Sequence, residues 1–128
     1  MEKHYKSEAH LQSLCTLWYK NDYCGNDVRM KKRLILIYNN PPNPRMGAIL
    51  KSLGLERGPT DQLFFSPLKL LVWIEYKIGY AKQSDEQVIF EEMLEEYPFC
   101  VHVVIRNETD FQNLIKRHYD GVRKSESY

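Results

Sequence analysis

The sequence predicts an α/β fold in which a mixed sheet of about four strands is flanked by helices. Amphipathic helical patterns alternate with short runs that are nearly continuous in apolar residues, as in strands buried on both faces. The chain has 128 residues, of which 43% are hydrophobic and 27% are charged. These values indicate one domain over residues 1–128. The expected helices and strands place its core over residues 7–119, and residues 120–128 are expected to form a flexible tail. The composition excludes a wholly disordered, collagen-like or fibrous protein.

Four segments show the spacing of an amphipathic helix. The first follows Ser7, a residue suited to an N-cap, and repeats Leu11, Cys15 and Trp18 along one face. A polar turn over residues 21–27 is expected to end it. The expected helices span residues 7–20, 45–53, 84–96 and 108–119.

Four apolar runs, separated by turn-forming residues, predict the strands. An Asn-Asn-Pro-Pro sequence at residues 39–42 stops the first run, and Gly58 and Pro59 precede the second. Residues 66–69 turn the second run into the third. The expected strands span residues 33–38, 61–66, 70–77 and 99–105.

Several functional classes lack their sequence signals. The longest apolar run, residues 70–74, is far too short to span a membrane, and the chain opens without the apolar segment of a signal peptide. The three cysteines form no CxxC pair, which argues against a disulfide framework or a structural zinc site. No nucleotide-binding fingerprint or serine–histidine triad occurs. We therefore expect a cytoplasmic protein that contacts no membrane and uses no nucleotide cofactor.

Charged residues at the end of the most apolar strand give the first functional signal. The apolar residues 70–74 lead directly into Glu75, Tyr76 and Lys77. Because strand side chains alternate, Glu75 and Lys77 share one face of the sheet. Burying both charges is costly unless they pair with each other or bind an ion. An ion pair at the strand end and a functional site are both compatible with this spacing.

Asp61 adds a second carboxylate at the same end of the sheet. It begins the preceding strand, so a hairpin over residues 66–69 would bring Asp61 and Glu75 together. Two such carboxylates repel unless a hard cation such as Mg²⁺ bridges them. Lys77 could then orient a water and stabilise charge that develops on phosphorus. The trio suits phosphodiester hydrolysis, although Asp61 alone also fits the role of a turn residue.

Three other polar residues have two interpretations each. Glu8 lies three positions before Leu11 on the apolar face of the first helix. It either interacts favourably with the helix dipole as an acid of the first turn, or it serves as an outer metal ligand. Gln87 either completes a capping box with Ser84 or takes part in the site. His102 lies in the middle of a strand, where a core or sheet role is more common than metal ligation.

These residues, in this order, resemble the virus-type replication-repair nuclease (VRR-NUC) domain of the PD-(D/E)xK nuclease superfamily. That family has an inward Glu on an early helix, a Gly-x-Pro-Asp turn, a Glu-x-Lys strand, a Ser/Thr-x-x-Gln helix start and a valine-rich strand. Thr60 departs from the pattern, since it stands where the family usually has the proline of Pro-Asp. The matching residues are Glu8, Gly58-Pro59-Thr60-Asp61, Glu75-Tyr76-Lys77, Ser84 to Gln87, and Val101-His102-Val103-Val104.

The resemblance implies a restriction-endonuclease-like core and a Mg²⁺- or Mn²⁺-dependent DNA endonuclease. It also implies a homodimer of phage or bacterial origin that cuts branched DNA, such as four-way (Holliday) junctions, in DNA repair. Lys77 would position the attacking water, and Gln87 would support Lys77 or the scissile phosphate. The implied metal ligands are Asp61, Glu75, the backbone carbonyl of Tyr76, and Glu8 through water.

Two other functions stay open beside this one. The first is a catalytically inactive DNA- or protein-binding module on the same fold. The second is a restriction-type enzyme specific for a base sequence, which the short chain disfavours because it leaves little room for a separate reading domain.

Basic side chains gather locally although the net charge is only +1. Such clusters either contact phosphates without reading bases or form a solvated surface. Three asparagines beside the proposed cleft, Asn39, Asn40 and Asn43, fit either turn chemistry or backbone contacts. The candidates for contacts with the DNA backbone are Arg29, Lys31, Lys32, Arg33, Arg45, Lys51, Arg57, Lys69 and Lys82.

Overall fold

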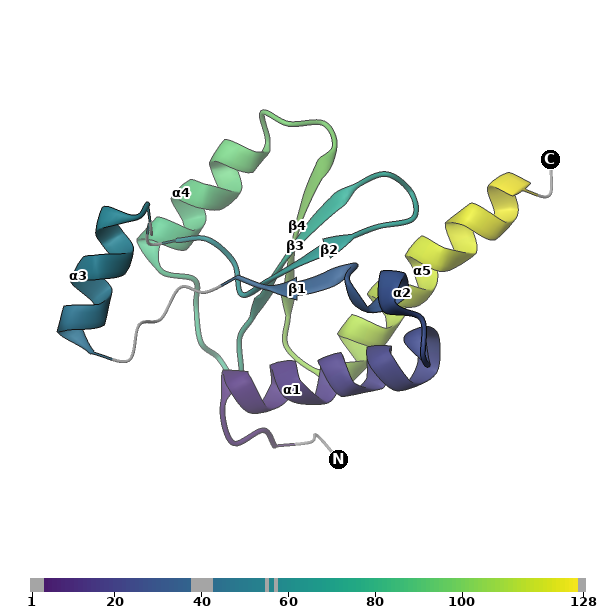
Figure 1. The fold of residues 1–128 in the computed structure, drawn as a ribbon, viewed down its shortest axis with the longest axis horizontal. Coiled ribbons are helices and arrows are strands. Elements are labelled where there is room, and N and C mark those ends of the chain that lie inside the picture. The colour runs from purple at the N-terminus through teal and green to yellow at the C-terminus, as the bar shows by residue number, and fades with distance from the viewer. Residues whose placement is uncertain (1–3, 38–42, 55, 57, 127–128) are drawn as a thin grey trace.

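A computed structural model describes residues 4–37, 43–54, 56 and 58–126 (Figure 1). Its four strands form one mixed sheet, as the sequence predicts, and their order is β1-β2-β3-β4. β1 and β2 pair antiparallel, β2 and β3 form the expected antiparallel hairpin, and β3 pairs in parallel with β4. The strands are β1 (Leu34–Leu36), β2 (Gln62–Phe65), β3 (Leu71–Tyr76) and β4 (Cys100–Ile105).

The helices lie on both faces of this sheet (Figure 1). Ser7 caps the first helix by accepting a hydrogen bond from the backbone N–H of His10, as its position in the sequence predicts. The longer helices are α1 (Glu8–Tyr19), α3 (Pro44–Ser52), α4 (Asp85–Leu94) and α5 (Glu108–Glu126).

The segment after α1 is helical, which corrects the expected polar turn over residues 21–27. Lys20–Cys24 forms a π-helical turn, η1, and Val28–Lys31 forms the short helix α2. The ring of Tyr23 stacks on that of Tyr119 at 4.7 Å, and Cys24 is buried. Tertiary packing of these side chains stabilises a helical backbone in a segment whose local sequence favours a turn.

The last helix also differs from the prediction, because it continues past residue 119 to Glu126. Its later part packs over the turn between β2 and β3. His118 Nδ1 lies 2.6 Å from Ser66 Oγ, and a Cβ at Gly121 would lie 3.0 Å from the Leu68 side chain. These tertiary contacts, rather than a further apolar repeat, extend the helix.

The main core lies between the sheet and the helices α1 and α5. Val72, Ile74 and Tyr76 of β3 are fully buried on this face. Leu11 of α1 and Phe111 of α5 pack in the same cluster. Within the part of the chain that the structure describes, no helix is long and apolar enough to cross a membrane. The cysteines Cys15, Cys24 and Cys100 are free thiols.

The opposite face of β3 and β4 is covered by α4. The rings of Trp73 and Phe90 meet edge to face with their centroids 5.3 Å apart, and the indole N–H of Trp73 donates to Cys100 Sγ at 3.4 Å. Alternation along β3 places Glu75 on this same face, so that one strand presents apolar residues to the core and the carboxylate to the α4 side.

Candidate active site

Asp61 and Glu75 meet at one end of the sheet. Gln62 pairs with Ile74, so the antiparallel register places Asp61 opposite Glu75 one step farther along. The carboxylate Oδ2 of Asp61 accepts a hydrogen bond of 2.8 Å from the backbone N–H of Tyr76. The backbone N–H of Asp61 donates to the carbonyl of Ile74 at 2.9 Å. The hairpin thus places Asp61 and Glu75 opposite each other at the same end of the sheet, as the sequence predicts.

The carboxylate of Glu75 is fully buried, and its two oxygens have different surroundings. Oε1 accepts a long hydrogen bond of 3.4 Å from Gln83 Nε2 and lies 3.5 Å from His102 Nε2. Among the residues that the structure describes, Oε2 is buried without a hydrogen-bond partner. A buried carboxylate oxygen in this condition is costly unless an ion or ligand completes it.

Lys77 follows directly after β3 and is held at the same edge. Its backbone N–H donates to the carbonyl of Ile105 at 3.0 Å, which ties it to the end of β4. Its side chain is only 12% exposed, and Nζ lies 3.9 Å from Oε1 of Glu8. The first turn of α1 therefore directs Glu8 toward the lysine, as its place on the apolar face of the helix predicts.

Gln87 forms the capping box that was one of its two interpretations. The backbone N–H of Ser84 donates to Gln87 Oε1 at 2.8 Å, and the backbone N–H of Gln87 donates to Ser84 Oγ at 3.2 Å. The glutamine that contacts Glu75 is Gln83, just before α4. The cap commits the Oε1 atom of Gln87 to the start of α4.

The turn that carries Asp61 packs against the same helix start. Gly58 has a φ of +104°, and a Cβ there would lie 2.5 Å from the backbone oxygen of Glu86. Only glycine fits this close approach at that backbone conformation. Thr60, the departure from the family pattern, is fully buried, and the carboxylate of Asp61 still reaches Tyr76.

A hydrogen-bonded chain fixes Tyr76, which lies between Glu75 and Lys77. The Tyr76 hydroxyl donates to Gln62 Oε1, and Gln62 Nε2 donates to Thr16 Oγ1 of α1 at 2.9 Å. Burial raises the pKa of the Tyr76 hydroxyl well above its usual range, with the nearby charge of Asp61 acting in the same direction. The phenol therefore stays protonated and remains a donor.

Two neighbours of this site are His102, for which the sequence analysis favoured a core or sheet role, and Glu91, which it did not consider as a site residue. His102 faces the site because it pairs with Trp73 in the parallel ladder, and its Nδ1 lies 3.5 Å from Oε1 of Glu91. The only sequence signal was a histidine within an otherwise apolar strand. That signal becomes specific only when the register between β3 and β4 is known.

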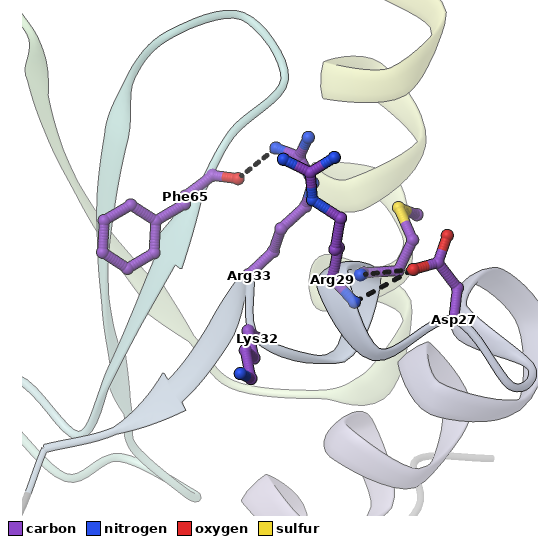
Figure 2. A pocket seen from close by; sticks show the side chains of 6 residues that line it. Asp27, Arg29, Lys32, Arg33 and Phe65 are labelled. Atoms are coloured by element: carbon purple, nitrogen blue, oxygen red, sulfur yellow. Dashed lines mark hydrogen bonds between the residues drawn. The ribbon is translucent and has the colours of Figure 1, made fainter.

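The basic cluster on α2 and the start of β1 lies at the other end of the sheet. Asp61 directly precedes β2 and Phe65 ends it, so the two residues lie about 13 Å apart at the usual rise of a strand. Figure 2 shows Arg29 and Arg33 beside Phe65, whose carbonyl accepts from Arg33 Nη1 at 3.1 Å. An open pocket of about 590 Å³ is lined by Asp27, Arg29, Met30, Lys32, Arg33 and Phe65.

The other candidate DNA contacts are spread over the surface. Lys31, Arg45, Lys51, Lys69 and Lys82 are exposed, and Asn43 serves as the N-cap of α3 through a bond of 2.8 Å from the backbone N–H of Met46. Asn39, Asn40 and Arg57 lie outside the described residues.

The donor set at the sheet end fits a hard divalent cation held partly by water. Within the described residues, no group of three or more His, Cys, Asp or Glu side chains is placed to hold a metal ion. Mg²⁺ commonly uses only one or two carboxylates and keeps several waters. The paired carboxylates of Asp61 and Glu75, with the unpartnered Oε2 of Glu75, match that pattern.

Comparison with known proteins supports the fold. No family model and no curated protein matches the sequence. A solved structure described as a VRR_NUC domain protein is similar to this chain with a TM-score of 0.66 and 18% sequence identity. The similarity covers 92% of this chain and 90% of that one. The expected likeness to a VRR-NUC fold is therefore confirmed in three dimensions.

Proposed function

We propose that this chain, which has the fold of a VRR_NUC domain protein, is a metal-dependent endonuclease that hydrolyses phosphodiester bonds in DNA. One observation carries the proposal: at the sheet end where Asp61 and Lys77 also lie, a buried oxygen of Glu75 lacks a protein partner among the described residues. A module that only bound DNA would gain nothing from an unsatisfied buried carboxylate.

The metal site would be formed by Asp61, Glu75 and the backbone carbonyl of Tyr76, with Glu8 acting through water. Bound Mg²⁺ or Mn²⁺ would supply Lewis-acid stabilisation of negative charge on the phosphate. Lys77 would orient the attacking water, and its neighbour Glu8 would restrain the position of the ammonium group.

Gln87 keeps a supporting role in the proposal through its amide N–H groups. Its Oε1 is committed to the cap of α4, so only the amide nitrogen would be available to a phosphate oxygen. The cap holds this side chain at the start of a helix, where backbone N–H groups also favour negative charge.

The basic side chains support DNA as the substrate class. Arg29, Lys32 and Arg33 form a basic pocket about 13 Å along β2 from the carboxylates, suited to phosphates rather than base edges. We propose branched DNA such as four-way junctions as the substrate. Symmetric cuts in a junction need two sites, which a homodimer would provide. Such a repair activity would take place in the cytoplasm of a bacterial or phage-infected cell.

The test is a cleavage assay on labelled four-way, flap and linear DNA in Mg²⁺, Mn²⁺ or EDTA. We expect metal-dependent cleavage of branched DNA by the wild type. Lys77→Ala should lose cleavage but keep its fold and its DNA affinity, and Lys20→Ala, a change of an exposed lysine on η1, should behave as the wild type. DNA binding without cleavage in either metal would instead support the inactive binding module. Defined cuts in linear duplex would support a restriction-type enzyme.

A further inference from the structure

A row of three buried or half-buried ionisable side chains connects α4 to the proposed metal site. His102 of β4 lies between two carboxylates: its Nε2 is 3.5 Å from Oε1 of Glu75, and its Nδ1 is 3.5 Å from Oε1 of Glu91. The side chain of His102 is 6% exposed, that of Glu75 is fully buried, and that of Glu91 is 39% exposed. In Figure 1, α4 lies beside the strands that carry the other two residues.

The surroundings of His102 do not explain it as a packing residue. Its face of the sheet carries Trp73 and Cys100, which pack with each other and with α4. Within the described residues, Nε2 of His102 has no partner in hydrogen-bonding geometry, although it faces Glu75. A polar ring in such a place costs stability unless it has a partner or a function.

Each nitrogen of the ring faces a carboxylate oxygen. In a neutral imidazole one of the two nitrogens carries the proton, and that nitrogen can donate a hydrogen bond to the carboxylate that it faces. Glu91 holds the ring from the α4 side, and the ring then faces Oε1 of Glu75 from the β4 side. Gln83 reaches the same Oε1 atom. Gln83 and His102 thus both contact Oε1, and among the described residues Oε2 has no partner and is left for an ion.

We infer that His102, held by Glu91, is a positioning residue that orients the carboxylate of Glu75 for metal binding. The inference rests on the proposed function, since it assigns Glu75 to a metal. Removing a residue that orients a metal-ligating side chain commonly lowers the affinity for the metal about 10–100-fold. His102 would act through Glu75 and would not touch the ion or the DNA.

Two substitutions at His102 test which ring nitrogen is needed for metal binding. His102→Gln places an amide nitrogen near the position of Nε2, on the side of Glu75, whereas His102→Asn places one near Nδ1, on the side of Glu91. The two variants are alike in polarity and close in size. Glu91→Gln tests the outer contact, and Glu92→Gln, a change of an exposed neighbour on α4, is its matched control.

The measurement is Mg²⁺ binding to the full chain by isothermal titration calorimetry, with thermal unfolding in EDTA to verify the fold. We expect His102→Asn to weaken binding about tenfold, while His102→Gln stays within about threefold of the wild type. Glu91→Gln should weaken binding about threefold and Glu92→Gln should leave it unchanged. At saturating Mg²⁺, His102→Asn should recover most of the wild-type turnover.

Three outcomes would overturn the inference. Equal Mg²⁺ affinity in His102→Asn and wild type, with both folded, would leave the histidine a packing residue. Equal losses in His102→Asn and His102→Gln would show that the contact with Glu75 is not the cause. A nitrogen coupling in the electron spin echo spectrum of bound Mn²⁺, absent from the His102 variants, would make His102 a direct ligand.

Failure of the proposed function would look different. A wild type that binds neither Mg²⁺ nor Mn²⁺ and cuts no DNA would contradict the metal site itself. A wild type that binds Mg²⁺ and cleaves, with His102→Asn indistinguishable from it, would contradict the positioning role alone.

Discussion

Replacing Glu75 with glutamine should stabilise the metal-free protein. The carboxylate is fully buried, and its Oε2 atom has no hydrogen-bond partner among the described residues. Glutamine keeps the shape of the side chain and removes the charge. Proteins often carry such locally unfavourable groups where a ligand is bound, and they lose stability for it in the free state.

The size of the effect follows from this burial. Leaving a buried polar atom unsatisfied costs about 1–3 kcal/mol, and the neutral amide recovers part of that, so we expect Glu75→Gln to gain about 1–2 kcal/mol. For a domain of this size the gain corresponds to a rise in melting temperature of about 3–8 °C. Mg²⁺ at tenfold its dissociation constant would stabilise the wild type by about 1.4 kcal/mol and the variant hardly at all.

The assay is thermal and urea unfolding of wild type and Glu75→Gln, each in EDTA and in Mg²⁺. Glu56→Gln, which changes an exposed loop carboxylate, serves as the control. The difference in unfolding free energy between Glu75→Gln and the wild type in EDTA should become smaller or vanish in Mg²⁺. A variant that is less stable than the wild type in EDTA would refute the reasoning, because the carboxylate would then be well satisfied without a metal. An equal Mg²⁺ response in both proteins would remove Glu75 from the metal site.

Three further predictions concern the elements that hold the site. Burial, with the charge of Arg117 in addition, lowers the pKa of His118 below its usual 6.5, so the unfolded state takes up this proton first. Stability should therefore fall by up to about 1.4 kcal/mol per pH unit as the pH drops below about 6.5, and His118→Gln should flatten this slope in urea unfolding. Gly58→Ala, which forces a Cβ to 2.5 Å from the backbone oxygen of Glu86 at a positive φ, should cost about 1–3 kcal/mol; a melting temperature equal to wild type would contradict that geometry. Ser84→Ala removes the cap of α4 and should cost about 1 kcal/mol, measured by urea unfolding, while Ser84→Asp, which keeps a capping oxygen, should cost little.

The sequence alone was sufficient for the parts of the site that depend on one hairpin. Asp61 and Glu75 belong to the two arms of one hairpin, so their opposite positions follow from antiparallel pairing and alternation along each strand. Glu8 could be placed because three-residue spacing puts it on the apolar face of α1. Local rules are reliable where the partners are close in sequence.

Residues that depend on distant pairing could not be placed in this way. His102 faces Glu75 through the parallel register of β3 and β4, and these strands are joined by a crossover through α4 and not by a tight turn. Gln83 lies just before α4, and Gln87 lies in its first turn. Only the structure shows that Gln83 contacts Glu75, whereas Gln87 takes part in the cap of α4. The added length of α5 likewise depends on contacts with the β2–β3 turn.

The link from Thr16 through Gln62 to Tyr76 has a consequence for engineering this protein. A designer seeking heat resistance would be drawn to these interior polar groups and would replace them with aliphatic ones. Such a redesign would leave the buried hydroxyl of Tyr76 without its acceptor, which costs about 1–3 kcal/mol, so it would lower the melting temperature. Screening on thermal tolerance alone would therefore retain the polar chain that fixes the residue between Glu75 and Lys77.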